Sequence, residues 1–285
     1  MYKFVLENIK GEQLTFNKIG GAFTIQEISG LSPASATINT SAAAYLDGAL
    51  FNSSKVDMRT LQIAFAIEKD AAANRIEVYK VLKPKQFVRA YYESETRNVQ
   101  IDGYVQSVDI THFNMKQICT CIILCPQPFW QAAQQLETML STVQGMFHFP
   151  FASLETPELV FSYLDPYSSV EIANEGDVQT GIIIELYANA AVSDPRIFDY
   201  LTGNFIALNF AMQAGDLITI DTRTGKKTIT LLRNAVTSNI FNSWVQGSTW
   251  LQLDFGGSVY AYEVGSGDAA DLTVTIKHMN LYEGV

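Results

Sequence analysis

The chain has 285 residues, of which 48% are hydrophobic and 17% are charged, a composition that fits a folded globular protein and excludes a disordered one. A formal net charge of −10 argues against general binding to a nucleic-acid backbone, which relies on clustered Lys and Arg. No apolar run approaches the ~20 residues of a membrane-spanning helix, and the segment "MYKFVLENIK" lacks the features of a signal peptide. We therefore expect a protein that folds where it is made.

The charge is unevenly distributed along the chain. Residues 1–150 contain 13 basic and 13 acidic residues, whereas residues 151–285 contain 6 and 16. This change in composition favours two domains with different surfaces.

Alternating apolar residues predict strands through most of the first half. Residues 2–8 and 12–17 alternate around Lys10-Gly11, which predicts a hairpin. The strand "TLQIAFAIEK" places its apolar residues on one face, and further strands are predicted at 86–93, 98–110 and 117–125. The register changes near Gly103, which suggests a β-bulge there.

One segment of the first half has helical periodicity. In "DAAANRIEVYKVLKP", Ala72, Ile76, Tyr79 and Leu82 recur at helical spacing. Asp70 can cap this helix and Pro84 ends it.

The segment "QAAQQLETMLSTVQG", residues 131–145, also has apolar residues at helical spacing. It predicts either a short helix or a connector between the two halves. We place an N-terminal domain at residues 1–130, the connector at 131–150 and a C-terminal domain at 151–285.

The second half has a β pattern throughout. Turn residues predict hairpins at "LTGN", residues 201–204, and at "DTRTGK", residues 221–226. The last strand is "DLTVTIK", and the short strands with frequent turns favour a sandwich or barrel. The predicted fold class is mainly β, with a single helix in the N-terminal domain.

Two glycine-containing segments imitate nucleotide-binding loops. In "GDLITIDTRTGKKTITL", nine residues separate Gly215 from Gly225 and a strand follows, so the spacing and helix of a phosphate-binding loop are missing. "GSGDAA", residues 265–270, matches a dinucleotide-binding fingerprint, but a β-branched strand follows it instead of a helix. We expect no cofactor.

The sequence gives only weak signals of a catalytic or metal-binding site. The three histidines, His112, His148 and His278, lie near no local nucleophile motif. Carboxylates in "VEIANEGD", residues 170–177, fit a solvated strand end better than a calcium or glycosidase site. We expect no enzyme.

Three cysteines lie on one face of the strand "QICTCIILC". Cys119, Cys121 and Cys125 lack the paired C-x-x-C spacing and nearby histidine of a metal site. We interpret them as small buried side chains in a reducing compartment and predict no metal.

Several segments resemble a known family when taken in order. They are "FTIQEISGLSPASATIN", "LDGALFNSSKVDMRTLQI", "CPQPFW", "VEIANEGDVQTG", "GDLITIDTRTGKKTITL", "STWLQLDFGG" and "HMNLYEGV". Together they resemble the distal tail proteins, known as Dit, of long-tailed non-contractile bacteriophages, over essentially the whole chain.

The resemblance implies a structural adaptor at the virion tail tip, assembled in the host cytoplasm. Dit proteins form a hexameric ring that joins the tail-tube protein to a tail-associated hub or fibre protein and offers docking sites to receptor-binding proteins. The N-terminal domain, with one helix and an extended hairpin or belt, builds the ring. The C-terminal domain is a galectin-like β-sandwich.

The segment Asn39 to Met58 is the least regular part of the first domain by pattern. We predict that it supplies the belt between subunits, with Asn39, Tyr45, Leu46 and Phe51 as contact residues; an ordinary surface loop is the alternative.

The competing functional class is carbohydrate recognition by the second domain. Trp244, Trp250, Tyr260 and Tyr262 could stack on sugar rings, although large aromatic side chains that alternate along strands are more often buried in a core.

Overall fold

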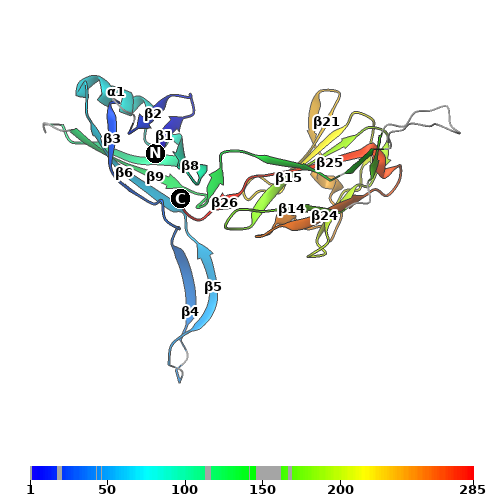
Figure 1. The fold of residues 1–285 in the computed structure, drawn as a ribbon. Helices are drawn as coiled ribbons and strands as arrows, with labels where there is room; N and C mark the ends of the chain where they lie inside the picture. Colours follow the sequence, from blue (N-terminus) through cyan, green and yellow to red (C-terminus); the bar gives the residue numbers. More distant parts are fainter. Residues whose placement is uncertain are drawn as a thin grey trace. The chain divides into compact units, whose positions relative to one another are not determined.

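The structure is a computed structural model that describes residues 2–17, 21–42, 44–45, 47–112, 117–140, 142–145, 162–165 and 169–285. These residues form two compact units. Unit 1 comprises residues 1–133 together with 281–285, and unit 2 comprises residues 134–280. In the described parts of both units, antiparallel strands predominate and there is one α-helix, so the predicted mainly-β fold is confirmed (Figure 1).

Unit 1 is built on one large antiparallel sheet with the order β2-β1-β7-β8-β9-β6-β3, and β10 and β26 extend it beside β8. Its elements are β1 (Lys3–Asn8), β2 (Gln13–Phe16), β3 (Phe23–Ser29), β4 (Ala36–Ser41), β5 (Leu50–Val56), β6 (Arg59–Ile67), α1 (Ala71–Val81), β7 (Phe87–Glu93), β8 (Asn98–Ile110), β9 (Gln117–Cys125), β10 (Trp130–Ala132) and β26 (Leu281–Tyr282).

The two outer strands of this sheet approach each other. The Asn17 backbone N–H donates to the Phe23 carbonyl at 3.0 Å, and the Asn17 side chain accepts from the Ile25 N–H at 2.9 Å. These bonds connect the end of β2 to β3, so the curved sheet encloses its apolar face.

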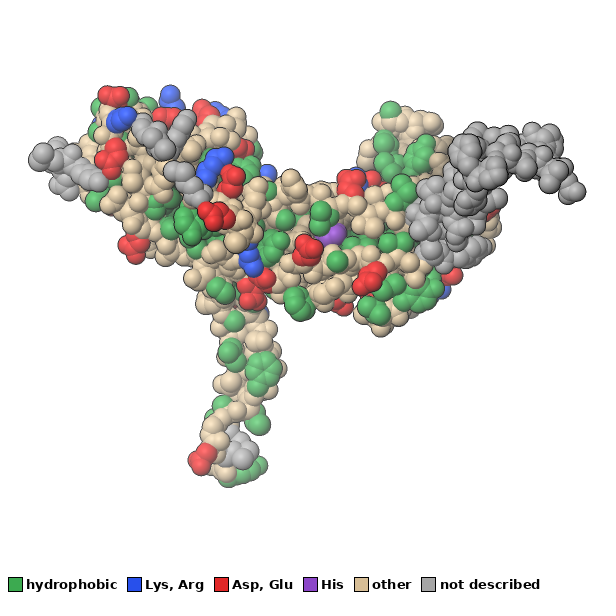
Figure 2. All heavy atoms as spheres, viewed as in Figure 1, with side chains coloured by type: hydrophobic (Ala, Val, Ile, Leu, Met, Phe, Trp, Pro, Cys, Tyr) green, Lys and Arg blue, Asp and Glu red, His purple; other side chains and the backbone are tan. Residues whose placement is uncertain are grey.

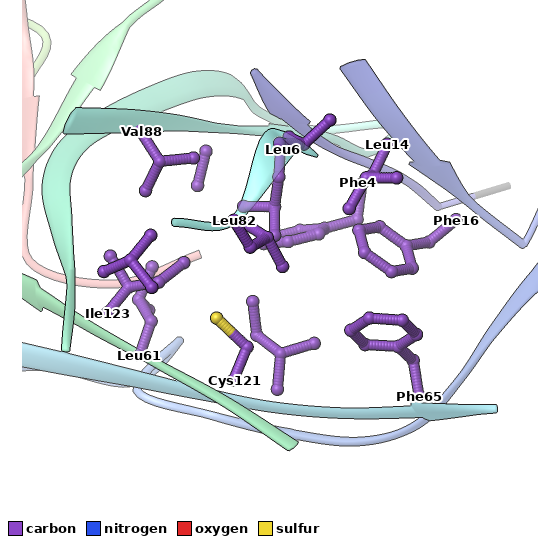
Figure 3. Close-up of a cluster of buried hydrophobic side chains, with 14 of the residues drawn as sticks. Phe4, Leu6, Leu14, Phe16, Leu61, Phe65, Leu82, Val88, Cys121 and Ile123 are labelled. Atoms are coloured by element: carbon purple, nitrogen blue, oxygen red, sulfur yellow. The ribbon is translucent and has the colours of Figure 1, made fainter. Parts of the chain in front are cut away.

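Alternation along the strands fills the core of unit 1. Leu61, Ile63 and Phe65 of β6 are fully buried, as the sequence pattern predicted, and Phe65 packs edge-on against Phe16 with ring centroids 4.9 Å apart. Figure 3 shows Leu61 and Phe65 on one side of this core, with Leu6 and Phe16 facing them from the other side.

The predicted helix is present as α1, but it turns a different face inward. Val78, Val81 and Leu82 enter the core, whereas Ile76 and Tyr79 are 56% and 40% exposed. Asp70 stands before the helix in a left-handed conformation, and its side chain makes no capping hydrogen bond. The predicted cap by Asp70 is therefore wrong, although the helix itself is confirmed.

The cysteine face of β9 belongs to the same core. Cys119, Cys121 and Cys125 are buried free thiols. Burial raises the pKa of Cys121 and of Cys125 to about 12. They are core side chains, as the sequence predicted.

Unit 2 contains two main antiparallel sheets. One has the order β11-β25-β15-β20-β21-β22 with β23 beside β15, and the other has the order β14-β24-β17-β18. The strands are β11 (Leu136–Met139), β12 (Thr142–Gly145), β13 (Ser162–Asp165), β14 (Val170–Ile172), β15 (Thr180–Ala188), β16 (Val192–Ser193), β17 (Arg196–Asp199), β18 (Phe205–Ala207), β19 (Ala211–Met212), β20 (Leu217–Asp221), β21 (Thr228–Arg233), β22 (Val236–Asn239), β23 (Gln252–Leu253), β24 (Ser258–Glu263) and β25 (Leu272–His278). Short 3₁₀ turns occur at Phe241–Ser243 and Ala269–Asp271.

Both sheets of unit 2 contribute to one apolar core. Ile184 of β15 and Val274 of β25 come from the first sheet, and Ile197 of β17 and Tyr260 of β24 come from the second. The hairpins predicted at residues 201–204 and 221–226 are confirmed by the pairs β17–β18 and β20–β21.

The helix considered for residues 131–145 is wrong, because strands occupy this segment. β11 forms the edge of a sheet by pairing with β25, and Leu136 and Met139 are 42% and 47% exposed. The helical spacing of these two residues therefore does not mark a buried face.

The bulge predicted near Gly103 lies further along β8. Gly103 pairs regularly with Val88, and the register against β9 shifts between Val105 and Ser107. Close packing, and not a bulge, explains the glycine at position 103. A Cβ there would lie 2.6 Å from Ile123 Cγ2 and 2.9 Å from Cys125 Sγ.

Candidate assembly surface

The segment predicted as an irregular loop is a regular β-hairpin. β4 and β5 pair antiparallel from Ala36↔Val56 to Ser41↔Leu50, with a register shift between Asn39 and Thr40. We call residues 36–56 the arm. In Figure 1 the arm extends away from the sheet of unit 1.

Side chains add polar links along the arm. Asn39 Nδ2 donates to Ser53 Oγ at 3.0 Å. At the inner end, Thr37 Oγ1 donates to Asp57 Oδ2 at 2.7 Å, and the Asp57 N–H donates to the Ser35 carbonyl at 2.9 Å. These bonds hold the hairpin in register without a core of its own.

The arm exposes apolar side chains on both faces. Ile38 is 62% exposed, Leu50 57% and Phe51 66%, and Tyr45 near the tip is 91% exposed. Figure 2 shows hydrophobic side chains along the arm among neutral polar groups. Lys55 is the one charged residue within β4 and β5.

An isolated two-stranded hairpin is marginally stable in water, and exposed apolar side chains that gather on one element are typical of contact surfaces. The arm therefore has the chemistry of a protein-binding element.

Of the predicted contact residues, Asn39, Tyr45 and Phe51 lie on the arm with exposed side chains. Leu46 lies outside the described residues. Their contact with another subunit stays a prediction.

Both nucleotide-loop imitations are turns. In the β20–β21 hairpin, Gly225 has φ of +77° and the Lys226 N–H donates to the Arg223 carbonyl at 3.0 Å. Asp221 binds the Arg223 guanidinium, with Nη2 to Oδ2 at 2.6 Å. Residues 265–270 lead through a short 3₁₀ turn into β25.

The histidines do not build a catalytic group in the described structure. His112 is an exposed residue of unit 1, and its Nδ1 lies 3.4 Å from Arg75 Nη1. His278 is buried on β25, and His148 lies outside the described residues. Burial lowers the pKa of His278, and an interaction with the Ala173 backbone acts weakly in the opposite direction.

The carboxylate side chains of residues 170–177 lie around a loop, and hydrogen bonds from the Asn174 side-chain amide connect this loop to the core. Asn174 is buried, and its Nδ2 donates to the carbonyls of Val178 and Leu253 at 3.0 and 3.3 Å. Glu171, Glu175 and Asp177 are exposed, as in a solvated strand end. Among the residues that the structure describes, no group of three His, Cys, Asp or Glu could hold a metal ion.

An open groove of about 1000 Å³ lies on the described surface of unit 1. It follows the outer face of β1, β2 and β7, where Lys3 and Glu93 form an ion pair at 3.4 Å beside Tyr91. The described lining of this groove includes neither histidine nor cysteine.

The four aromatic residues considered for sugar binding fall into two pairs. Tyr260 and Tyr262 are buried, and their hydroxyls donate to the Gln252 and Ala269 carbonyls at 2.9 and 3.3 Å. Their alternative interpretation as core is confirmed. Trp244 and Trp250 are partly exposed and pack on each other with ring centroids 4.7 Å apart.

No helix in the described parts of the chain has the length and apolar character needed to cross a membrane.

Comparison with known proteins finds a match to a family model over part of the chain and solved structures with the same fold over nearly all of it. Residues 175–282 match the family model described as the siphovirus-type tail component, C-terminal domain. No curated protein matches the chain significantly.

Two kinds of solved structure share the fold. The crystal structure of the Dit protein of phage SPP1, described as a paradigm of the hub adsorption apparatus in phages that infect Gram-positive bacteria, superposes with a TM-score of 0.69 at 14% identity. The match covers 98% of both chains. A chain of the phage P2 baseplate in its activated conformation with Ca gives a TM-score of 0.56 at 13% identity, covering 100% of both chains. The chain thus has the fold of a Dit-like tail protein, which confirms the resemblance predicted from the sequence.

Proposed function

We propose that this protein is a structural component of a phage tail tip or baseplate. In this proposal six copies form a ring that joins the end of the tail tube to a hub or fibre protein and offers docking sites to receptor-binding proteins. It is a part of the virion assembled in the host cytoplasm, and it has no catalytic role. The likeness of unit 2 to galectins also stays a prediction.

The observation that carries the proposal is the combination of the Dit-like fold with the exposed arm. The descriptions of the two solved structures name a hub adsorption apparatus and a baseplate. The apolar side chains of the arm are exposed in the described structure, so their burial requires a second molecule.

A ring requires a heterologous contact, in which one surface of a subunit binds a different surface of the next. The arm suits such a contact because it reaches away from its own sheet (Figure 1). Its nearly uncharged strands can be buried against a neighbour without a large desolvation cost.

The test is the mass of the purified protein by light scattering after size exclusion, with negative-stain images of the same peak. The expected result is a six-fold ring. A monomer at high protein concentration that also fails to assemble on tail tubes would contradict the proposal.

Carbohydrate binding receives less support from the described side chains. Two of the four candidate aromatic residues are in the core, and Trp244 and Trp250 pack against each other and against Phe241. A glycan screen on the full chain tests this alternative directly.

A further inference from the structure

Residues 281–285 return from unit 2 to unit 1 and complete its sheet. Tyr282 pairs with Trp130 and Leu281 with Gln131 at β10. We call residues 281–285 the latch. The latch lies next to the segment that leads into the arm, and we call residues 30–35 and 57–59 the arm root.

A buried arginine connects the latch to the arm root. Arg59 is 2% exposed, and its guanidinium donates only to backbone carbonyls among its described bonds. Nε reaches the Pro128 carbonyl at 2.6 Å, and Nη1 reaches the carbonyls of Ser32, at 2.5 Å, and Gly30. Nη2 reaches the Glu283 carbonyl.

One cation therefore joins three separate stretches of chain: the arm root, the segment before β10 and the latch. Its charge has no carboxylate in these bonds, and burial lowers the pKa of Arg59. A buried guanidinium is costly unless its donors are satisfied, so a site with this set of acceptors holds its geometry tightly.

Further contacts fasten the latch. The Val285 N–H donates to the Leu31 carbonyl at 3.1 Å. Arg97 donates to the Gly284 carbonyl and stacks on the Tyr282 ring, with its guanidinium carbon 4.4 Å from the ring centroid.

The fit between the latch and the arm root is close at one glycine. A Cβ on Gly284 would lie 3.1 Å from Pro33 Cδ and 3.2 Å from the Leu31 carbonyl oxygen. A Cβ at position 284 would therefore be closer to the arm root than most Cβ contacts in proteins.

We propose that the latch fixes the arm root, so that the arm is held in its assembly-competent direction only when residues 281–285 are seated on unit 1. This inference rests on the proposed ring function. Because the latch follows unit 2 in the sequence, the arm is fixed only after unit 2 has been synthesised and the chain has returned.

Two features favour a role of the latch in fixing the arm root over ordinary packing of a chain end. The latch contacts the arm root through Val285 and pairs with β10 through Leu281 and Tyr282, so it connects the root of the arm to the sheet of unit 1. The arm has no other described support than its own inner end, since its side chains are exposed on both faces.

The test is hydrogen exchange by mass spectrometry on the full chain, together with its assembled mass. In Arg59→Lys the compact ammonium cannot reproduce the planar fork that reaches acceptors in three directions. In Gly284→Val the new side chain wedges the latch away from Pro33 and Leu31. Arg89→Lys is the matched control, since Arg89 binds Asp102 on the outer side of the same sheet.

We expect the Asp57 amide of the arm root, whose N–H donates to the Ser35 carbonyl, to exchange at least about tenfold faster in Arg59→Lys and Gly284→Val than in the wild type or the control. Amides of β7 keep their protection, and the fraction of assembled protein falls. If Arg59→Lys loosens all of unit 1, Gly284→Val alone decides.

Unchanged exchange at the arm root in a variant whose latch amides are freed would overturn the proposal. Full assembly despite a loosened arm root would overturn it too. A wild type that never assembles, with latch variants that still loosen the arm root, would instead refute the proposed ring and leave the coupling of latch and root intact.

Discussion

Arg233 on β21 holds the carboxylate of Asp216, just before β20, with both prongs of its guanidinium: Nε donates to Oδ1 at 2.8 Å and Nη2 donates to Oδ2. Asp216 is 1% exposed and also accepts from the Gln213 N–H at 2.7 Å. This pair ties a loop of unit 2 to the neighbouring strand, and we expect it to make the stability of the unit depend on pH.

The first prediction concerns acid. The hydrogen bonds from Arg233 lower the pKa of Asp216 below its ordinary value. The ionised form is therefore favoured by folding, and the resulting stability is complete above the unfolded-state pKa of about 3.9 and is lost as pH falls further. Asp216→Asn should lower the melting temperature of unit 2 at neutral pH and flatten its decline below about pH 4.

Thermal unfolding of the full chain at stepped pH measures this. Glu171→Gln, an exposed carboxylate of the same unit, is the control and should follow the wild type. An equally steep acid decline in Asp216→Asn would contradict the prediction.

A second pH effect should come from His278, in a different window. Burial lowers the pKa of His278, so the folded state disfavours the charged imidazole. Stability from this group is complete above the unfolded-state pKa of about 6.5 and is lost as pH falls below that value. His278→Gln should remove the part of the decline that lies just below about pH 6.5, while Asp216→Asn leaves that part in place.

The third prediction is that the thiols of unit 1 are inert in the folded protein. Burial raises the pKa of Cys119, and it raises those of Cys121 and Cys125 to about 12, so almost no thiolate forms at neutral pH. A thiol reagent should label none of the cysteines in native buffer and all three in denaturant. Rapid labelling of the native protein would show that β9 opens readily.

Strands with one buried face were predictable because their alternation records that face directly. Leu61, Ile63 and Phe65 on β6 are an example. Which face of α1 is buried was not predictable in this way. Ile76 and Tyr79 have apolar spacing on the exposed side of the helix, while Val78 and Val81 enter the core. Spacing alone does not say which of two apolar stripes has a sheet behind it.

Long-range partners were also invisible in the local pattern. β11 is a strand because β25 lies beside it, with Leu136 opposite His278, and nothing in residues 131–145 records that partner. The arm was located by its irregular pattern, yet it is a regular hairpin, because strands exposed on both faces need no alternation. The return of the latch could have been suspected only from Arg59 beginning a buried strand.

Gly103 provides a test of close approach between strands. A Cβ at this position would lie 2.6 Å from Ile123 Cγ2 and 2.9 Å from the Leu124 carbonyl oxygen. Gly103→Ala should therefore destabilise unit 1 by about 1–3 kcal/mol, as overpacking of a core does. Gln100→Ala on the same strand is the control, with an expected change within about 0.5 kcal/mol. Urea unfolding measures both, and equal stabilities would show that β8 and β9 can separate without cost.

The last prediction separates assembly from folding. Phe51 and Tyr45 are 66% and 91% exposed, so replacing both with Ser removes no core contact and should change the free energy of unfolding by less than about 0.5 kcal/mol. If the arm binds a neighbouring subunit, the same double variant should lose most of its assembled mass, because exposed apolar side chains contribute mainly when a partner covers them. Tyr79→Ser on α1, which is 40% exposed in the same unit, is the matched control and should assemble normally. Light scattering across a concentration series measures the difference. Rings that form equally well without Phe51 and Tyr45 would exclude these residues from the subunit contact and leave the arm as an ordinary surface hairpin.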